Sequence, residues 1–103
     1  MKEQFRQGDV LVVRVKSIPS NAVDVTPKDR IVLMHGEVTG HAHAVREVTK
    51  ARLIDVQAER YLNVLQETTL LHEEHGAIVL RKGHYQQAFQ TEEQGEEVRP
   101  VAD

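Results

Sequence analysis

The strongest constraint on the fold is a set of short runs of branched apolar residues, each bounded by turn-forming residues. The clearest runs are 10–16, 30–35 and 77–81. Gly8 signals a turn before the first run, and Pro19 ends it. Branched side chains pack well on a pleated surface, and runs of this length are typical of strands. The pattern predicts an all-β domain, either a small sandwich or a partly closed barrel.

Further strands are predicted over 41–48, 51–57, 60–72 and 84–90. A brief edge pairing is expected at Val23 and Val25. Alternate side chains of a strand face the same way. The positions expected to point inward from 60–72 are Leu62, Val64, Leu70 and His72.

The middle of the chain also fits a helix. Five apolar residues recur there at the spacing of an amphipathic helix, namely Ile54, Ala58, Tyr61, Leu62 and Leu65. A short helix within 52–66 is therefore an alternative to two strands joined by a turn near Ala58.

The length and the charge distribution indicate one domain followed by an acidic segment. A chain of 103 residues has the size of a single domain with its own core. We expect the β domain to span 1–91 and residues 92–103 to form a mobile or edge-docked tail. Five of the 16 acidic side chains lie in this tail, against one of the 13 basic ones. The body is thus close to neutral.

The composition excludes or disfavours several classes of protein. The chain has no cysteine, which rules out disulfides, iron–sulfur clusters and thiolate zinc sites. Its polar start and short apolar runs predict neither a signal peptide nor a membrane span, so a cytoplasmic protein is expected. A near-neutral body with few aromatic residues disfavours nucleic-acid binding without excluding it.

The first candidate site is the pair His41 and His43, which follows a turn between two glycines. In an extended strand the two imidazoles lie on one face, as two ligands of one metal ion would. Glu47 is a further candidate, either as a carboxylate ligand or as a partner that orients an imidazole. The alternative for the pair is a hydrogen-bonded core histidine beside a solvated one. The alternative for Glu47 is a cross-strand salt bridge with an arginine.

The second candidate site is the pair His72 and His75, which brackets two glutamates. The alternative for those glutamates is a solvated turn. Four of the six histidines adjoin a glycine, and this placement predicts imidazoles at strand ends, where functional groups gather. The predicted ligands of a Zn²⁺, Fe²⁺, Mn²⁺ or Ni²⁺ ion are His41, His43, Glu47, His72, His75 and His84.

The run His41-x-His43-x-x-x-Glu47 resembles the first metal-binding motif of the cupins, small double-stranded β-barrels. The resemblance implies that His41, His43 and Glu47 are metal ligands in a cupin-like fold. Residues 81–84 are loosely similar to the second cupin motif, which would add His84 as a ligand. That segment lacks the proline of the motif, and its histidine comes early.

Three functions follow from these patterns. The first is a small metal-binding β protein with a histidine cluster, with or without enzymatic activity. The second is a non-catalytic binding or assembly module that forms a homo-oligomer through its β edges. The third is metal-free acid/base chemistry by paired histidines, for example on an RNA phosphodiester, with Arg46 or Lys82 stabilising charge. The metal, the substrate and the partner are left open.

Overall fold

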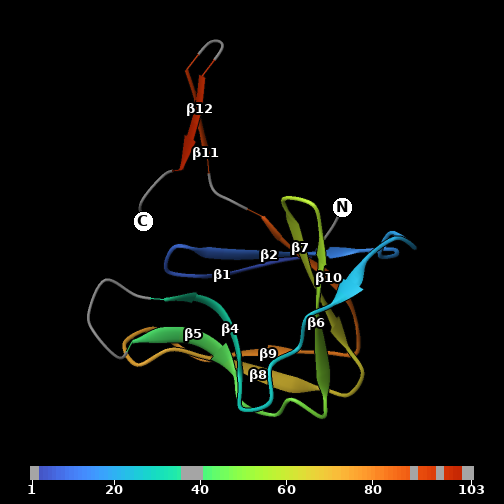
Figure 1. Cartoon of the computed structure of the whole chain (residues 1–103). Helices are drawn as coiled ribbons and strands as arrows, with labels where there is room; N and C mark the ends of the chain where they lie inside the picture. The colour runs from blue at the N-terminus through green and yellow to red at the C-terminus, as the bar shows by residue number, and fades with distance from the viewer. Residues whose placement is uncertain (1–2, 36–40, 89–90, 95–96, 101–103) are drawn as a thin grey trace.

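The computed structural model of the protein describes residues 3–35, 41–88, 91–94 and 97–100. Every regular element within these ranges is a strand, and neighbouring strands pair antiparallel. Two sheets face each other as the layers of a sandwich (Figure 1). The prediction of an all-β fold is confirmed, and the form is the sandwich rather than the barrel.

The larger layer is a six-stranded sheet whose hairpins follow the apolar runs and their turns. Gly8, which has a φ of 56°, lies in the turn between its first two strands. In spatial order the strands are β1 (Gln4–Gln7), β2 (Val10–Val15), β10 (Gly83–Ala88), β7 (Glu59–Val64), β6 (Ala51–Val56) and β3 (Val23–Asp24).

The smaller layer is a four-stranded sheet with shorter strands. In spatial order they are β4 (Ile31–His35), β5 (Ala42–Val45), β8 (Thr68–Leu71) and β9 (Ile78–Leu80). A bulge interrupts the pairing of β4 with β5 between Val32 and Met34. Bulges bend a strand and redirect side chains, and this one lies at the end of the sheet that carries the histidines.

The core fills the space between the two layers. Alternate residues of the strands point into it, as a period of two requires. Val10 and Val12 of β2 are fully buried, whereas Leu11 and Val13 are only partly so. The other fully buried apolar side chains are Ile31, Val45, Ala51, Leu70, Leu80 and Tyr85. Leu62 and Val64 are also buried, so the inward face predicted from alternation is confirmed at these positions.

The strand predicted over 51–57 and the turn near Ala58 are confirmed by the hairpin of β6 and β7, whereas the alternative helix and the single strand over 60–72 are not. The helix considered for 52–66 is absent, because β6 and β7 form a hairpin there and Gln57 turns it with a φ of 54°. The single strand predicted over 60–72 is two strands in different sheets, β7 and β8. The apolar residues of this segment fit both the strand period of two and the helix period of 3.6. Burial of the strand faces against the core decides in favour of the strands.

The acidic C-terminal segment contains a separate hairpin. Strand β11 (Thr91–Gln94) pairs with β12 (Glu97–Pro100) as a two-stranded sheet. Neither strand is paired with the two larger sheets in the described part of the chain. The described residues contain no helix that could span a membrane.

Candidate metal centre

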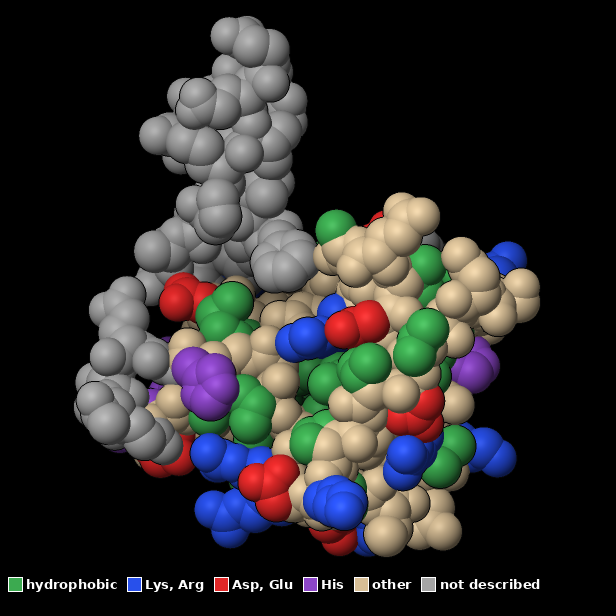
Figure 2. Space-filling view, viewed as in Figure 1, with side chains coloured by type: hydrophobic (Ala, Val, Ile, Leu, Met, Phe, Trp, Pro, Cys, Tyr) green, Lys and Arg blue, Asp and Glu red, His purple; other side chains and the backbone are tan. Residues whose placement is uncertain are grey.

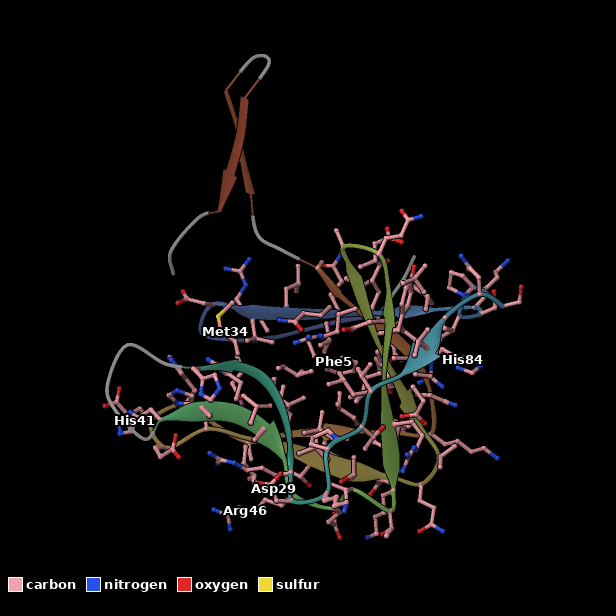
Figure 3. All side chains as sticks on the ribbon, in the orientation of Figure 1. Phe5, Asp29, Met34, His41, Arg46 and His84 are labelled. Carbon is pink, nitrogen blue, oxygen red and sulfur yellow. The ribbon has the colours of Figure 1, made fainter. Side chains whose placement is uncertain are left out.

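Pairing of β5 with β8 brings the two histidine pairs to one end of the sandwich. His43 lies in β5 and His41 directly precedes it, while His72 and His75 follow β8. The two strands are antiparallel neighbours, so the beginning of β5 lies beside the end of β8. Figure 3 shows His41 at this end of the domain.

The four imidazoles form a continuous cluster. The ring of His72 is central, with its centroid 4.2 Å from that of His43, 4.7 Å from that of His75 and 5.7 Å from that of His41. The rings of His43 and His75 are nearly parallel, at a centroid distance of 5.8 Å. The structure thus brings together four of the six residues that the sequence predicts as ligands.

Gln7 of β1 fixes the orientation and the tautomer of His43. The amide nitrogen of Gln7 donates hydrogen bonds to the carbonyl oxygens of Leu70 and Gly76, each at 2.9 Å. The amide oxygen therefore faces Nδ1 of His43 at 2.8 Å, and that nitrogen must be the donor. The other ring nitrogen, Nε2, is left with a lone pair. A histidine held in this way is typical of metal sites.

His43 is neutral at physiological pH. Its side chain is buried, with only 3 % of the residue exposed. Burial, followed by the nearby imidazoles of His72 and His75, lowers the pKa of His43 to about 4. Asp9 and Glu73 oppose this shift with their negative charge, but they do not outweigh burial. The lone pair on the ring is thus available without competition from a proton.

His72 has one nitrogen committed to the turn that follows β8. Its Nδ1 accepts hydrogen bonds from the backbone N–H groups of Glu74, at 3.0 Å, and of His75, at 3.3 Å. The neutral ring consequently carries its proton on Nε2, the opposite arrangement from His43. The imidazole holds the bend over residues 73–75 in shape.

Glu73 completes a group of donors with the outermost and the central imidazole. One donor atom from each of His41, His72 and Glu73 lies within 4.8 Å of the other two. A carboxylate oxygen of Glu73 accepts the backbone N–H of Ala42 at 2.9 Å, and this hydrogen bond lowers the pKa of Glu73. The carboxylate of Glu74 lies 3.7 Å from Nδ1 of His41. Two imidazoles and a carboxylate make a set that divalent transition metals accept.

The turn between β1 and β2 lies against the same cluster. A Cβ atom placed on Gly8 would be 2.5 Å from Nε2 of His75. The imidazole therefore packs directly on the glycine, at a position where the backbone also has a positive φ. The first hairpin thereby supplies a wall beside His75 as well as the amide that orients His43.

Glu47, predicted as a carboxylate ligand, lies outside the cluster. Its carboxylate accepts the hydroxyl of Thr68 at 2.9 Å and pairs with Lys50 at 2.8 Å. Thr68 begins β8, whereas His72 follows the end of that strand, about 13 Å further at 3.3 Å per residue. Glu47 does form a salt bridge, but its partner is Lys50, three residues further on, rather than an arginine across the strands.

His84, the last predicted ligand, lies on the opposite side of the domain from His41 (Figure 3). It belongs to β10, between Val15 and Asn63, and its buried Nδ1 has no hydrogen-bond partner among the described residues. The ligand set implied by the cupin resemblance is consequently not assembled. His41 and His43 instead meet the second predicted pair, His72 and His75, and Glu47 and His84 lie outside this cluster, where Glu73 is the nearby carboxylate.

Two residues of the centre had no distinctive signal in the sequence. From the sequence, Glu73 fits a solvated turn as well as a ligand. Its hydrogen bond from the backbone N–H of Ala42, which holds the carboxylate near His41, depends on strand pairing and has no local signal. Gln7 lies 36 positions before His43 and precedes the first firm apolar run. The short spacing within each histidine pair was the sequence feature that pointed to the cluster.

Comparison with known proteins places the chain in a family. Residues 6–90 match the family model described as "Domain of unknown function (DUF8820)". The chain belongs to this family. The matched segment includes both histidine pairs, Gln7 and Glu73. No curated protein and no solved structure matches the chain.

Proposed function

We propose that this member of the DUF8820 family binds one divalent transition-metal ion at the end of the sandwich. The observation that supports the proposal most strongly is the proximity of the donor atoms of His41, His72 and Glu73. Two ligand atoms that are each about 2.1 Å from one ion lie up to about 4.2 Å apart. Small side-chain rotations therefore suffice to close the group around an ion.

The donor set indicates which ions and which chemistry suit the site. Imidazole nitrogens accept Zn²⁺, Fe²⁺, Ni²⁺ and Mn²⁺, and a carboxylate is compatible with each of them. Three protein ligands leave coordination positions for water or a substrate, as in catalytic metal sites. His43 adds a third imidazole beside the group, with a lone pair at Nε2.

Binding an ion through Nε2 of His72 has a cost that is specific to this structure. The proton on Nε2 must leave, and Nδ1 must take one up to keep the ring neutral. The two backbone N–H groups that Nδ1 now accepts then lose their partner. Metal binding should therefore rearrange the bend at residues 73–75, which is exposed enough to move without disturbing the core.

Metal-free acid/base chemistry is less well supported. A general base works best when its pKa is near the operating pH. The pKa of His43 is lowered to about 4, so this ring is a weak proton acceptor at neutral pH. Lys82, one of the two cations considered for that chemistry, lies next to β10 on the other side of the domain, where its carbonyl accepts a hydrogen bond from Arg14.

The test is a metal titration of untagged protein that has been stripped with a chelator. Calorimetry with Zn²⁺, Fe²⁺, Mn²⁺ and Ni²⁺ should show one site per chain for at least one ion. His41→Ala and His72→Ala should each weaken binding by more than the roughly 10–100-fold that losing an orienting partner costs. His84→Ala, a histidine outside the cluster, is the matched control and should bind the metal as the parent does.

Either of two results would remove the proposal. One is the absence of binding by all four ions to protein that is folded by circular dichroism. The other is equal weakening by His84→Ala and His41→Ala, since that result would place the ion elsewhere. His41 precedes its strand and is only half-buried, so its replacement should leave the fold intact.

A second function, assembly through strand edges, has one observation in its favour. The edge strands β9 and β3 carry exposed valines: Val79 is 53 % exposed and Val23 is 61 % exposed. Unpaired edges with apolar side chains are templates for strand addition. If a homo-oligomer forms through β9, light scattering should show a discrete species that Val79→Lys dissociates. A monomer in the parent protein would exclude this function. The cytoplasmic location stays a prediction from the sequence.

A further inference from the structure

A pocket of about 270 Å³ opens beside the proposed metal centre and shares two residues with it. His72 and Glu73 line this pocket as well as supplying donors to the metal group. The remaining lining residues come from the outer side of the small sheet and its ends, namely Arg30, Ala42, Ala44, Arg46 and Leu71.

The floor of the pocket is made by small residues. Ala44 pairs with Leu71 of β8, and Ala42 precedes it by two positions on the same face of β5. Each alanine exposes 3 % of its surface or less, and a methyl group is all that its side chain adds to the wall of the pocket. A longer side chain at either position would fill the space, and the pocket exists because this face of β5 is alanine.

Two arginines that line the pocket have no charged partner among the described residues. Arg30 directly precedes β4 and Arg46 directly follows β5, and these strand ends are adjacent because the two strands pair antiparallel. Over the described ranges, neither guanidinium takes part in an ion pair or a side-chain hydrogen bond. By contrast, Arg14, Arg52 and Arg60 each pair with a carboxylate. Lys and Arg side chains gather along the lower edge of the face seen in Figure 2, and Arg46 lies at this lower side in Figure 3.

We propose that this pocket binds a small oxyanion, a phosphate or carboxylate group, next to the metal ion. The guanidinium fork matches the geometry of both groups and binds them with two parallel hydrogen bonds. The pocket is smaller than the roughly 300–1,000 Å³ of sites for drug-sized ligands, so the anion is carried by a small molecule. This inference rests on the proposed function, because it supplies the ligand class for the same centre.

The charge of the pocket links the two sites. Without a metal ion, Glu73 offsets one of the two arginines, and the pocket has a net charge of about one positive unit. A divalent ion held by Glu73 and His72 would raise that charge by two units at the pocket wall. An oxyanion therefore binds more tightly to the metal-loaded protein, and by linkage the metal binds more tightly when the anion is present.

The experiment measures anion binding to the full chain with and without metal. Inorganic phosphate and succinate are the two probes, titrated by calorimetry into stripped and metal-loaded protein at low salt. At least one probe should bind with one site per chain, and metal loading should tighten its binding. Arg46→Gln and Arg30→Gln should each weaken binding about tenfold, as expected for loss of a charge-assisted bidentate contact. The better probe identifies the group as a phosphate or a carboxylate.

Arg81→Gln is the matched control, since Arg81 is exposed, does not line the pocket and loses the same charge. It should bind the anion as the parent does. The proposal fails if neither probe binds the metal-loaded protein, or if Arg81→Gln weakens binding as much as Arg46→Gln does.

Metal affinity measured without any anion separates this failure from that of the proposed function. Metal binding without anion binding overturns the pocket alone. Anion binding that depends on Arg46 but is unaffected by the metal supports the pocket and overturns its link to the metal centre.

Discussion

Two buried glutamines tie the sheets of the sandwich together, and they differ in what their side-chain oxygen does. Gln7 of β1 and Gln87 of β10 expose 2 % and 6 % of their surface. Each amide nitrogen donates to a carbonyl of the small sheet or its connections, Gln7 to Leu70 and Gly76, Gln87 to Leu33. The oxygen of Gln7 accepts a hydrogen bond from Nδ1 of His43, whereas the oxygen of Gln87 has no partner among the described residues.

The difference separates a contact that only joins the two sheets from one that also orients a histidine. A hydrogen bond from a buried amide to a carbonyl across the layers stabilises the sandwich at both positions. Of the two, only Gln7 also selects the tautomer of a titratable ring, that of His43, which lies against other imidazoles. Gln87 therefore only joins the two sheets, whereas Gln7 joins the sheets and orients His43.

The largest expected effect of this arrangement is a dependence of stability on pH. The pKa of His43 is about 4 in the folded protein, below the 6.5 of an unperturbed imidazole. The unfolded chain therefore binds more protons between these values, and the stability of metal-free protein falls as the pH falls through this window. The full loss is about 3 kcal/mol of unfolding free energy, reached near pH 4.

Urea unfolding at pH 7.5, 5.5 and 4.5 in the presence of a chelator measures this loss. His43→Gln should abolish most of the dependence, while Gln87→Leu should lower stability equally at each pH. A parent protein whose stability is constant between pH 7 and 4.5 would contradict the burial of a neutral His43.

The sequence predicts those features of the fold and of the histidine cluster that depend on residues close together in the chain. Alternation in Leu62, Val64 and Leu70 predicted their burial because the period of two is a property of the strand itself. The His41 and His43 spacing predicted two imidazoles of one centre for the same reason. The pairing of β5 with β8 is not local, so the sequence could not distinguish Glu47 from Glu73 as the carboxylate. The cupin motif favoured Glu47, which is nearer in sequence to His41 and His43. The pairing of β5 with β8 instead brings Glu73 beside them.

The second prediction compares the two glutamines directly. Gln7→Leu removes the partner of Nδ1 of His43, so the ring loses its fixed tautomer and orientation. Metal affinity should fall roughly 10–100-fold, the usual effect of removing a partner that orients an imidazole. Gln87→Leu also removes a buried hydrogen bond but should leave metal affinity unchanged. Calorimetry on both variants decides the matter, and equal losses would show that His43 is not coupled to the ion.

The third prediction uses two glycines beside the cluster. Gly8→Ala forces a side chain into a positive φ and against the ring of His75, whereas a Cβ on Gly76 meets nothing within 4 Å. Gly8→Ala should cost about 1–2 kcal/mol of stability, the usual penalty of a left-handed backbone. It should also displace the imidazole signals of His75 in NMR spectra. Gly76→Ala should do neither, and an unchanged His75 in Gly8→Ala would contradict the packing.

The smallest expected effect concerns the carboxylate that the cupin resemblance implies. Glu47→Gln weakens the ion pair with Lys50 and the hydrogen bond from the buried hydroxyl of Thr68. The melting temperature should fall slightly, and metal affinity should not change. Glu73→Gln is the matched substitution and should weaken metal binding. Reversal of these two results would restore the cupin ligand set and overturn the centre described above.

X-ray absorption on the metal-loaded protein tests the central claim most directly. The account predicts a first shell of nitrogen and oxygen atoms, near 2.0–2.1 Å for zinc. It also predicts the outer-shell scattering of at least two imidazole rings, and His41→Ala should lose one of these rings while His84→Ala retains them all. A first shell of oxygen atoms alone, with no imidazole scattering, would contradict a metal centre built from the two histidine pairs.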